Sequence, residues 1–156
     1  YVSISFLFQP EREIDHAIQI NLKAPIQISK TAVKIFSAKQ KGVIINMSSM
    51  VADTGNAFQT IYSATKAGLA TFSKSLAKET GVLFENNQIR VLSVSPGLID
   101  TDMTGAIPQA EQDKIISNIP LRRMGYADEI AKVVSFLISD GASFVNGSTI
   151  HVNGGL

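Results

Sequence analysis

Short apolar runs alternate along the chain with longer amphipathic segments. Three runs, at residues 43–47, 89–94 and 148–152, are rich in valine and isoleucine and are bounded by glycine, serine or asparagine. This pattern predicts buried strands. Apolar residues recur at intervals of three and four, which predicts helices, in residues 11–39, 63–84 and 128–139.

Three features complicate this pattern. Pro25 interrupts the first helical segment, so we expect a kink or a break there. Residues 1–8 alternate loosely, as a strand would. Residues 100–124 have no strong period until Asp113, and we interpret them as a mobile lid or as a surface loop with a short helix.

The order helix, strand, helix, strand, helix, strand predicts an α/β fold with a doubly wound parallel sheet and helices on both faces. Ligands of such sheets bind beyond the carboxyl ends of the strands. The three predicted strands are followed by small, polar or turn residues, at 48–49, 95–97 and 153–155. We therefore expect the functional site at this edge.

Composition narrows the function classes. The 156 residues are 45% hydrophobic and 17% charged, with a formal charge of +1, so the chain lacks the cationic excess of a nucleic-acid binder. The absence of cysteine excludes disulfides and thiolate metal sites. The two histidines are too far apart in the pattern to suggest a metal pair, and we expect no metal site. No apolar run is long enough to span a bilayer.

Tyr62 and Lys66 lie four residues apart at the start of a predicted helix, so they share one face. Alone, such a pair is compatible with a solvated lysine above a half-buried tyrosine. Ser49 follows the first predicted strand, thirteen residues before Tyr62, and its spacing favours it over Ser48. A nearby ammonium lowers a phenol's pKa toward the range of acid–base catalysis, and a serine hydroxyl can stabilise a carbonyl oxygen that gains negative charge.

At this point the sequence resembles the short-chain dehydrogenase/reductase family, which has a Rossmann-like fold. The resemblance covers about residue 10 to residue 156. It is carried by five ordered motifs, namely Gln19-Ile20-Asn21-Leu22-Lys23-Ala24-Pro25, Ile45-Asn46-Met47-Ser48-Ser49, Tyr62-Ser63-Ala64-Thr65-Lys66-Ala67-Gly68, Val94-Ser95-Pro96-Gly97 through Met103, and Asn146-Gly147 through Gly155.

The resemblance implies a role for each matching residue. Tyr62 exchanges the proton with the substrate oxygen, Lys66 lowers the pKa of Tyr62 and binds the nicotinamide ribose, and Ser49 polarises the carbonyl. Asn21, the fourth catalytic position, holds a water that connects Lys66 to solvent. The residues implied to bind the cofactor are Tyr62, Lys66, Pro96, Gly97, Ile99 and Thr101.

Within the family, the runs 21–25, 97–104, 119–125 and 151–155 most resemble the 3-oxoacyl-(acyl carrier protein) reductases. This similarity implies NADPH-dependent reduction of a 3-oxoacyl thioester in fatty acid synthesis, with NAD as the other possible cofactor. The substrate would be a small molecule or bound to acyl carrier protein. Two alternatives are a dehydrogenase of another secondary alcohol or ketone, such as a steroid or sugar alcohol, and a non-catalytic homologue that acts by binding.

The family's glycine-rich cofactor fingerprint does not occur in this sequence, and the chain begins with Tyr1. We therefore expect residues 1–156 to be a single domain that is incomplete at its amino terminus. The resemblance also implies a homodimer or homotetramer packed through the helices at 11–39 and 63–84. It implies a location in the cytoplasm or the mitochondrial matrix.

Overall fold

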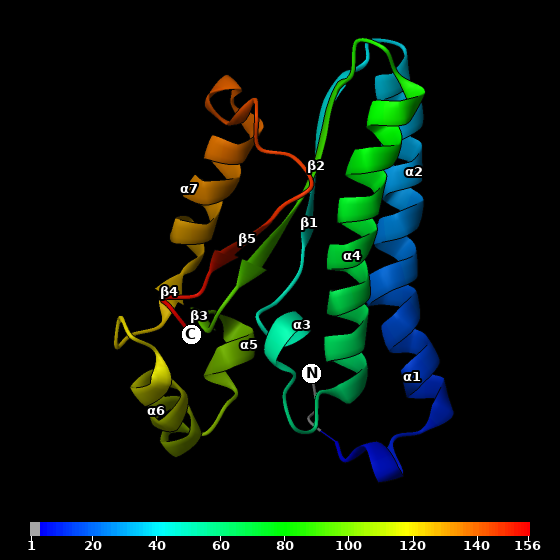
Figure 1. Ribbon diagram of the computed structural model, residues 1–156. Coiled ribbons are helices and arrows are strands. Elements are labelled where there is room, and N and C mark those ends of the chain that lie inside the picture. The colour runs from blue at the N-terminus through cyan, green and yellow to red at the C-terminus, as the bar shows by residue number, and fades with distance from the viewer. Residues whose placement is uncertain (1–3) are drawn as a thin grey trace.

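The structure, a computed structural model, describes residues 4–156. Its main sheet consists of β1 (Lys41–Met47), β2 (Gln88–Pro96) and β5 (Thr149–Val152), which are parallel and adjacent in the order β1-β2-β5. The helices α1 (Glu11–Ile18), α2 (Ala24–Ser37) and α4 (Thr60–Leu83) lie on one side of this sheet, and α7 (Ala127–Ile138) lies on the other (Figure 1). The three predicted strands and the doubly wound α/β arrangement are confirmed.

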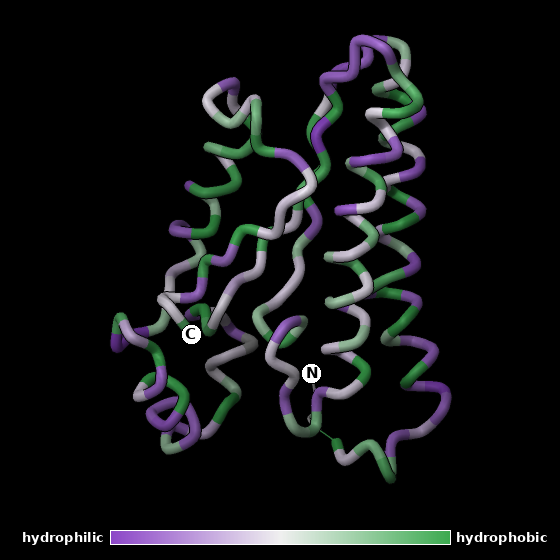
Figure 2. The backbone as a smooth tube through the Cα atoms, in the orientation of Figure 1, coloured by the Kyte–Doolittle hydropathy of each residue, from purple (hydrophilic) through white to green (hydrophobic). Residues whose placement is uncertain are grey.

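The remaining elements are short. They are the helical turns η1 (Phe6–Phe8), η2 (Gln19–Lys23) and η3 (Asp140–Ala142), the helices α3 (Val51–Thr54), α5 (Asp102–Gly105) and α6 (Gln109–Asn118), and the strands β3 (Ile99–Asp100) and β4 (Gly125–Tyr126), which pair in parallel with each other. Most of them lie beyond the carboxyl ends of β1, β2 and β5. The polar connections that lead into β1 and β2 lie at the opposite end of the molecule (Figure 2). There the Gln88 amide donates a hydrogen bond to the Gln40 carbonyl, 2.7 Å away.

Each face of the sheet has its own apolar core. On the α2 and α4 side, Ile44, Ile89 and Val91 pack with Ala77. On the α7 side, the neighbouring positions Leu92 and Val94 of β2 pack with Leu137 and Ala142 of the α7–η3 segment. Because successive side chains of a strand point to opposite faces, β2 is apolar on both, as expected of a central parallel strand.

The predicted helical interruption at Pro25 is present, but it lies in the turn before the proline. There the chain forms a π-helical turn, η2, in which the Ala24 amide donates to the carbonyl of Gln19, five residues earlier. Pro25 itself lies in the first turn of α2. Because proline has no N–H, the carbonyl of Asn21 cannot receive the hydrogen bond that residue 25 would otherwise donate in an α-helix.

Arg90 is the one charged residue of β2, whose other residues are apolar or uncharged polar. Only 8% of its surface is exposed, and its guanidinium donates hydrogen bonds to the carbonyls of Leu137 at 2.7 Å and Ser139 at 3.2 Å. These carbonyls lie at the carboxyl end of α7, where helical carbonyls lack partners within the helix and where a positive charge is favoured. Arg90 thus joins the centre of the sheet to the end of α7.

The structure corrects one expectation, the strand near the amino terminus, and defines the segment 100–124. Residues 6–8 form a short 3₁₀ turn with exposed side chains, and residues 4–8 pair with no strand of the described chain; residues 1–3 of this prediction lie outside it. The segment 100–124, for which we expected a mobile lid or a surface loop with a short helix, contains two helices, α5 and α6. Gln112 stabilises this arrangement by donating to the carbonyls of Thr104 and Ile107.

Candidate active site

Ser49 follows the end of β1, and hydrogen bonds to β2 hold its backbone. The amide of Ser48 donates to the carbonyl of Val94 at 2.7 Å, and the amide of Met50 donates to the carbonyl of Pro96 at 3.0 Å. The carbonyl of Ser49 accepts a hydrogen bond from Ala52 as α3 begins. Pro96 is therefore joined directly to the segment that carries Ser49.

The two neighbouring serines have different environments. Ser48 is buried, and its hydroxyl donates to the main-chain carbonyl of Lys66, 3.0 Å away. Ser49 is half-buried, and its side chain forms a hydrogen bond with that of Tyr62. The geometry thus uses Ser48 to attach β1 to α4 and leaves Ser49 beside the phenol. The catalytic role of Ser49 stays a prediction.

Tyr62 and Lys66 lie on one face of the first two turns of α4. The Lys66 Nζ atom is 5.5 Å from the centre of the Tyr62 ring and donates to the carbonyl of Met47, the last residue of β1, at 2.8 Å. Ser49, Tyr62 and Lys66 are therefore brought together at the carboxyl edge of the sheet. A hydroxyl, a phenol and an ammonium at one point can polarise a carbonyl, transfer a proton and stabilise the charge that remains.

Burial is the main influence on the ionisation of both groups. It raises the pKa of the Tyr62 phenol above its ordinary value, and the hydrogen bond with Ser49 acts in the opposite direction. Burial also lowers the pKa of Lys66. At neutral pH the phenol therefore holds its proton. The predicted lowering of the Tyr62 pKa by Lys66 stays a prediction.

Asn21 lies in the turn η2, which packs against α4. A methyl group on Gly68 would lie 3.4 Å from the side chain of Leu22, so Leu22 rests on α4 two residues beyond Lys66. The arrangement brings the backbone around Asn21 toward the same part of α4 as Lys66. The role of Asn21 in holding a water stays a prediction.

The other predicted cofactor residues follow β2. The amide of Gly97 donates to the carbonyl of Val152 at 3.0 Å, and an added Cβ on Gly97 would approach the Cα of Asn153 to 2.7 Å. Only glycine allows the chain to pass this closely. Ile99 lies in β3. Thr101 precedes the first turn of α5, and its amide donates to the Thr104 hydroxyl at 2.9 Å.

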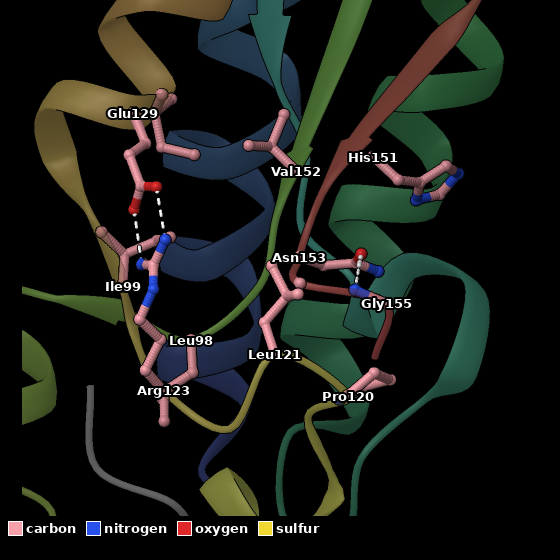
Figure 3. Close-up of a pocket in the computed structure, with 13 residues that line it drawn as sticks. Leu98, Ile99, Pro120, Leu121, Arg123, Glu129, His151, Val152, Asn153 and Gly155 are labelled. Atoms are coloured by element: carbon pink, nitrogen blue, oxygen red, sulfur yellow. Dashed lines mark hydrogen bonds and ion pairs between the residues drawn. The ribbon is translucent and has the colours of Figure 1, made fainter.

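A cleft of about 490 Å³ lies beyond β5, beside β3 and α7 (Figure 3). Ser49, Tyr62 and Lys66 do not line it, and Ile99 is the one predicted site residue that does. Arg123 and Glu129 border the cleft and form a two-pronged ion pair, with N–O distances of 2.7 and 2.8 Å. These hydrogen bonds pair the Arg123 guanidinium with Glu129 at the edge of the cleft, which lies apart from Ser49 and Tyr62.

Several contacts near the site were not predicted. The carbonyl of Met47 that holds Lys66 is a main-chain group, and side-chain patterns do not identify such partners. His151 Nδ1 lies 3.8 Å from Asp53 Oδ2, which connects β5 to α3 next to Ser49. Residues 4–156 contain no group of three or more histidine, aspartate or glutamate side chains placed to hold a metal ion. Each helix in this range is too short or too polar to cross a membrane.

The comparisons with known proteins agree with this geometry. A family model described as "Enoyl-(Acyl carrier protein) reductase" matches residues 2–156. The chain is 46% identical over 139 residues to the 3-oxoacyl-(acyl-carrier-protein) reductase FabG of Pseudomonas aeruginosa, covering 89% of this chain and 55% of the relative. The chain belongs to the short-chain dehydrogenase/reductase family.

Two further relatives in this family carry the same printed name. The reductase of Haemophilus influenzae is 46% identical over 139 residues, covering 89% of this chain and 56% of the relative. That of Escherichia coli is 41% identical over 146 residues, covering 94% and 58%. The chain therefore spans little more than half the length of these relatives.

Membership of the short-chain dehydrogenase/reductase family implies a nicotinamide cofactor. The donor set fits the nicotinamide end of such a molecule, because the ammonium of Lys66 and the phenol of Tyr62 stand together where ribose hydroxyls could accept and donate hydrogen bonds. A glycine-rich turn that would hold the pyrophosphate is not in the sequence.

Proposed function

We propose that this chain carries the active site of an NADPH-dependent 3-oxoacyl thioester reductase. The observation that carries this proposal is the hydrogen bond between Ser49 and Tyr62 with the ammonium of Lys66 beside the ring. The names of the relatives in Pseudomonas, Haemophilus and Escherichia supply the substrate class. The preference for NADPH over NADH rests on the sequence resemblance to these reductases.

The chain's residues would act on the substrate carbonyl in a defined order. The Ser49 hydroxyl donates a hydrogen bond to the 3-oxo oxygen and fixes its position near the Tyr62 hydroxyl. Tyr62 then transfers its proton to that oxygen as the oxygen becomes negative. The ammonium of Lys66 stabilises the phenolate that remains, which matters because burial alone disfavours this anion.

A nicotinamide cofactor, when bound, would supply the hydride that the carbonyl carbon receives. The residues proposed to hold it are Tyr62, Lys66, Pro96, Gly97, Ile99 and Thr101. Asn21 is proposed to hold the water through which Lys66 exchanges protons with solvent. Since an ammonium has three N–H groups and Met47 accepts from one, two remain for ribose and water.

The test is NADPH oxidation by the full-length protein with acetoacetyl thioester and, separately, crotonyl thioester. We expect reduction of the acetoacetyl compound and little reduction of the crotonyl compound, which lacks the 3-oxo group. The second substrate separates this proposal from the enoyl reductase named by the family model. Reduction of crotonyl thioester alone would contradict the proposal, as would activity confined to steroids or sugar alcohols.

Variants test the residue roles. Tyr62→Phe should lower kcat by roughly 10²–10⁴-fold, the usual contribution of general acid catalysis. Tyr126→Phe is the matched control, because that tyrosine is exposed beside Arg123 and away from Ser49. Full turnover by Tyr62→Phe would remove Tyr62 from the mechanism. NADPH binding without turnover of any substrate would instead favour a binding subunit.

We also propose that the protein is a homodimer or homotetramer that associates through its long helices. The outer face of α2 has a shallow groove of about 440 Å³, lined by Ala24, Gln27, Ile28, Thr31, Ala32 and Ile35. Ile28 and Ile35 are 69% and 67% exposed. Large apolar side chains at this spacing form a continuous stripe, which is typical of a helix that packs on another.

The substrate could be free or bound to acyl carrier protein, and a cytoplasmic location is part of the same proposal. The relatives compared above come from bacteria, so they lend no support to the alternative of a mitochondrial matrix location. Residues 1–156 are proposed to form one part of a single larger domain.

A further inference from the structure

The turn between α3 and α4 contains an unusual residue. The amide of Gln59 donates to the carbonyl of Asn56 at 3.1 Å, which closes a four-residue turn. Phe58 occupies the third position of this turn and has a φ of +64°. Turns that need a positive φ at the third position normally place glycine or asparagine there, because a β-carbon is crowded in that conformation.

Two other non-glycine residues in the described chain share this conformation, and each has a hydrogen bond that compensates for it. The side chain of Gln40 accepts from the amide of Asn86 at 3.0 Å. The guanidinium of Arg122 donates to the carbonyl of Ser117. The ring of Phe58 has no polar atom with which to form such a bond, and it is 58% exposed, so folding gains little from burying it.

The position of this turn relates it to the proposed active site. Residues 50–61 connect Ser49 to Tyr62, and Phe58 lies four residues before Tyr62. The carbonyl of Gln59 accepts the hydrogen bond from Ser63 at 2.8 Å with which α4 begins. An exposed aromatic ring is therefore held, at a conformational cost, on the segment that joins the two polar catalytic groups. Strained residues of this kind are concentrated at functional sites.

We propose that Phe58 is a specificity-determining residue that contacts the acyl chain of the substrate beyond its 3-oxo group. This inference rests on the proposed function. Ser49 and Tyr62 would bind the polar oxygen, while the ring of Phe58 would cover methylene groups that are otherwise exposed to water. A longer acyl chain would then bury more apolar surface and react with a higher kcat/KM than a short one.

The test compares 3-oxooctanoyl and acetoacetyl thioesters of N-acetylcysteamine with the full-length protein. Wild type should have a higher kcat/KM for the 3-oxooctanoyl thioester than for the acetoacetyl thioester. Phe58→Gly should lower the ratio of these two kcat/KM values about tenfold. Phe58→Leu, which keeps an apolar side chain, should retain part of the preference. Gln40→Gly is the matched control for glycine at a positive φ, and it should leave the ratio unchanged because Gln40 lies at the opposite end of the sheet.

A binding measurement separates this inference from the proposed function. Octanoyl-N-acetylcysteamine, which has no 3-oxo group, should raise the melting temperature of wild type and of Gln40→Gly but not of Phe58→Gly. If no thioester is reduced but this shift is seen and depends on Phe58, the reductase proposal fails and the acyl contact stands. If 3-oxo thioesters are reduced while Phe58→Gly keeps the ratio and the shift, the acyl contact is wrong. The absence of any shift in wild type also overturns it.

Discussion

Lys66 and Met47 are joined by a hydrogen bond of 2.8 Å from the lysine ammonium to the main-chain carbonyl. The residue that follows the strand, Ser48, donates a hydrogen bond from its hydroxyl to the carbonyl of Lys66 at 3.0 Å. These two bonds attach the start of α4 to the end of β1. The separation of Ser49 from Tyr62 is therefore set by the packing of a helix on a strand, and a flexible loop does not have to fix it.

The hydrogen bond between Ser49 and Tyr62 should be visible in the titration of the phenol. Because this bond lowers the pKa of Tyr62 while burial raises it, Ser49→Ala should raise that pKa further. The measurement is the tyrosinate ultraviolet absorbance on raising the pH, with the spectrum of Tyr62→Phe subtracted to remove Tyr1 and Tyr126. An unchanged or lower Tyr62 pKa in Ser49→Ala would contradict this prediction.

Gly97→Ala should destabilise the protein by about 1–3 kcal/mol, because the new methyl group meets the backbone and side chain of Asn153 at 2.7 and 2.8 Å. Gly81→Ala provides the control, since its methyl group would enter open space on α4. Alanine there should stabilise the protein by about 0.5 kcal/mol. Urea unfolding of both variants measures the difference, and equal stability of the two would show that Gly97 has room for a side chain.

Arg90→Met should lower the free energy of unfolding by about 2–4 kcal/mol, because the buried carbonyl of Leu137 and the partly buried carbonyl of Ser139 lose their charged donor. Arg90→Lys keeps the charge but cannot reach both carbonyls in the same way, so its loss should be intermediate. Urea unfolding again gives the values. Lys132→Gln, which removes an exposed ion pair with Asp128, should leave the urea midpoint almost unchanged. A midpoint for Arg90→Met equal to that of wild type would refute the capping role.

The pair formed by Arg123 and Glu129 should make stability depend on acid pH. The hydrogen bond from Arg123 lowers the pKa of Glu129 from 4.5 to about 2. As the pH falls, the unfolded chain therefore binds a proton at Glu129 before the folded protein does. The contribution of this ion pair to the stability of the fold is fully present above pH 4.5 and is lost as the pH falls through about 2. The melting temperature of Glu129→Gln should lie below that of wild type at neutral pH and converge with it toward pH 2. Arg123→Gln should converge in the same way, and a constant offset at all pH values would exclude this ion pair as the cause.

The proposed association through α2 predicts a change of mass on charging its outer face. Ile28→Glu should reduce the molar mass measured by light scattering after gel filtration to that of a smaller assembly. Phe144→Glu is the control, because Phe144 is also an exposed apolar residue but follows α7, which lies on the other side of the sheet. An unchanged mass for Ile28→Glu, with the protein still folded, would mean that the stripe on α2 does not join subunits.

The spacing of apolar residues predicts the main helices and strands of this protein, because each of them keeps one regular spacing along its length. The runs beginning at Val43 and Ile89 are rich in valine and isoleucine, and the structure confirms both as strands, with β2 between β1 and β5. Residues 6–8 have similar local composition but pair with no strand of the described chain, so the same apolar character leads to a turn. Local sequence cannot distinguish these cases, because strand formation depends on a partner that lies elsewhere.

The candidate active site could likewise be predicted from the sequence only in part. The spacing of Ser49, Tyr62 and Lys66 was sufficient to predict that they meet, because each lies near the end of a regular element. The partner of Lys66 and the burial that shifts both pKa values could not be predicted, since they depend on backbone atoms and on packing across the sheet. Arg90 was missed for a related reason, because a lone arginine in a strand gives no sign of the helix end that it reaches.

The pairing of β1 with β2, and of β2 with β5, joins residues that are about fifty positions apart in the sequence. Contacts between such distant residues form slowly, whereas α2 and α4 consist of local contacts that form early. Ser49 and Tyr62 can meet only after β1 has paired and α4 has packed on it. Catalytic competence should therefore be among the last properties that the folding chain acquires, and helix formation alone is not a measure of it.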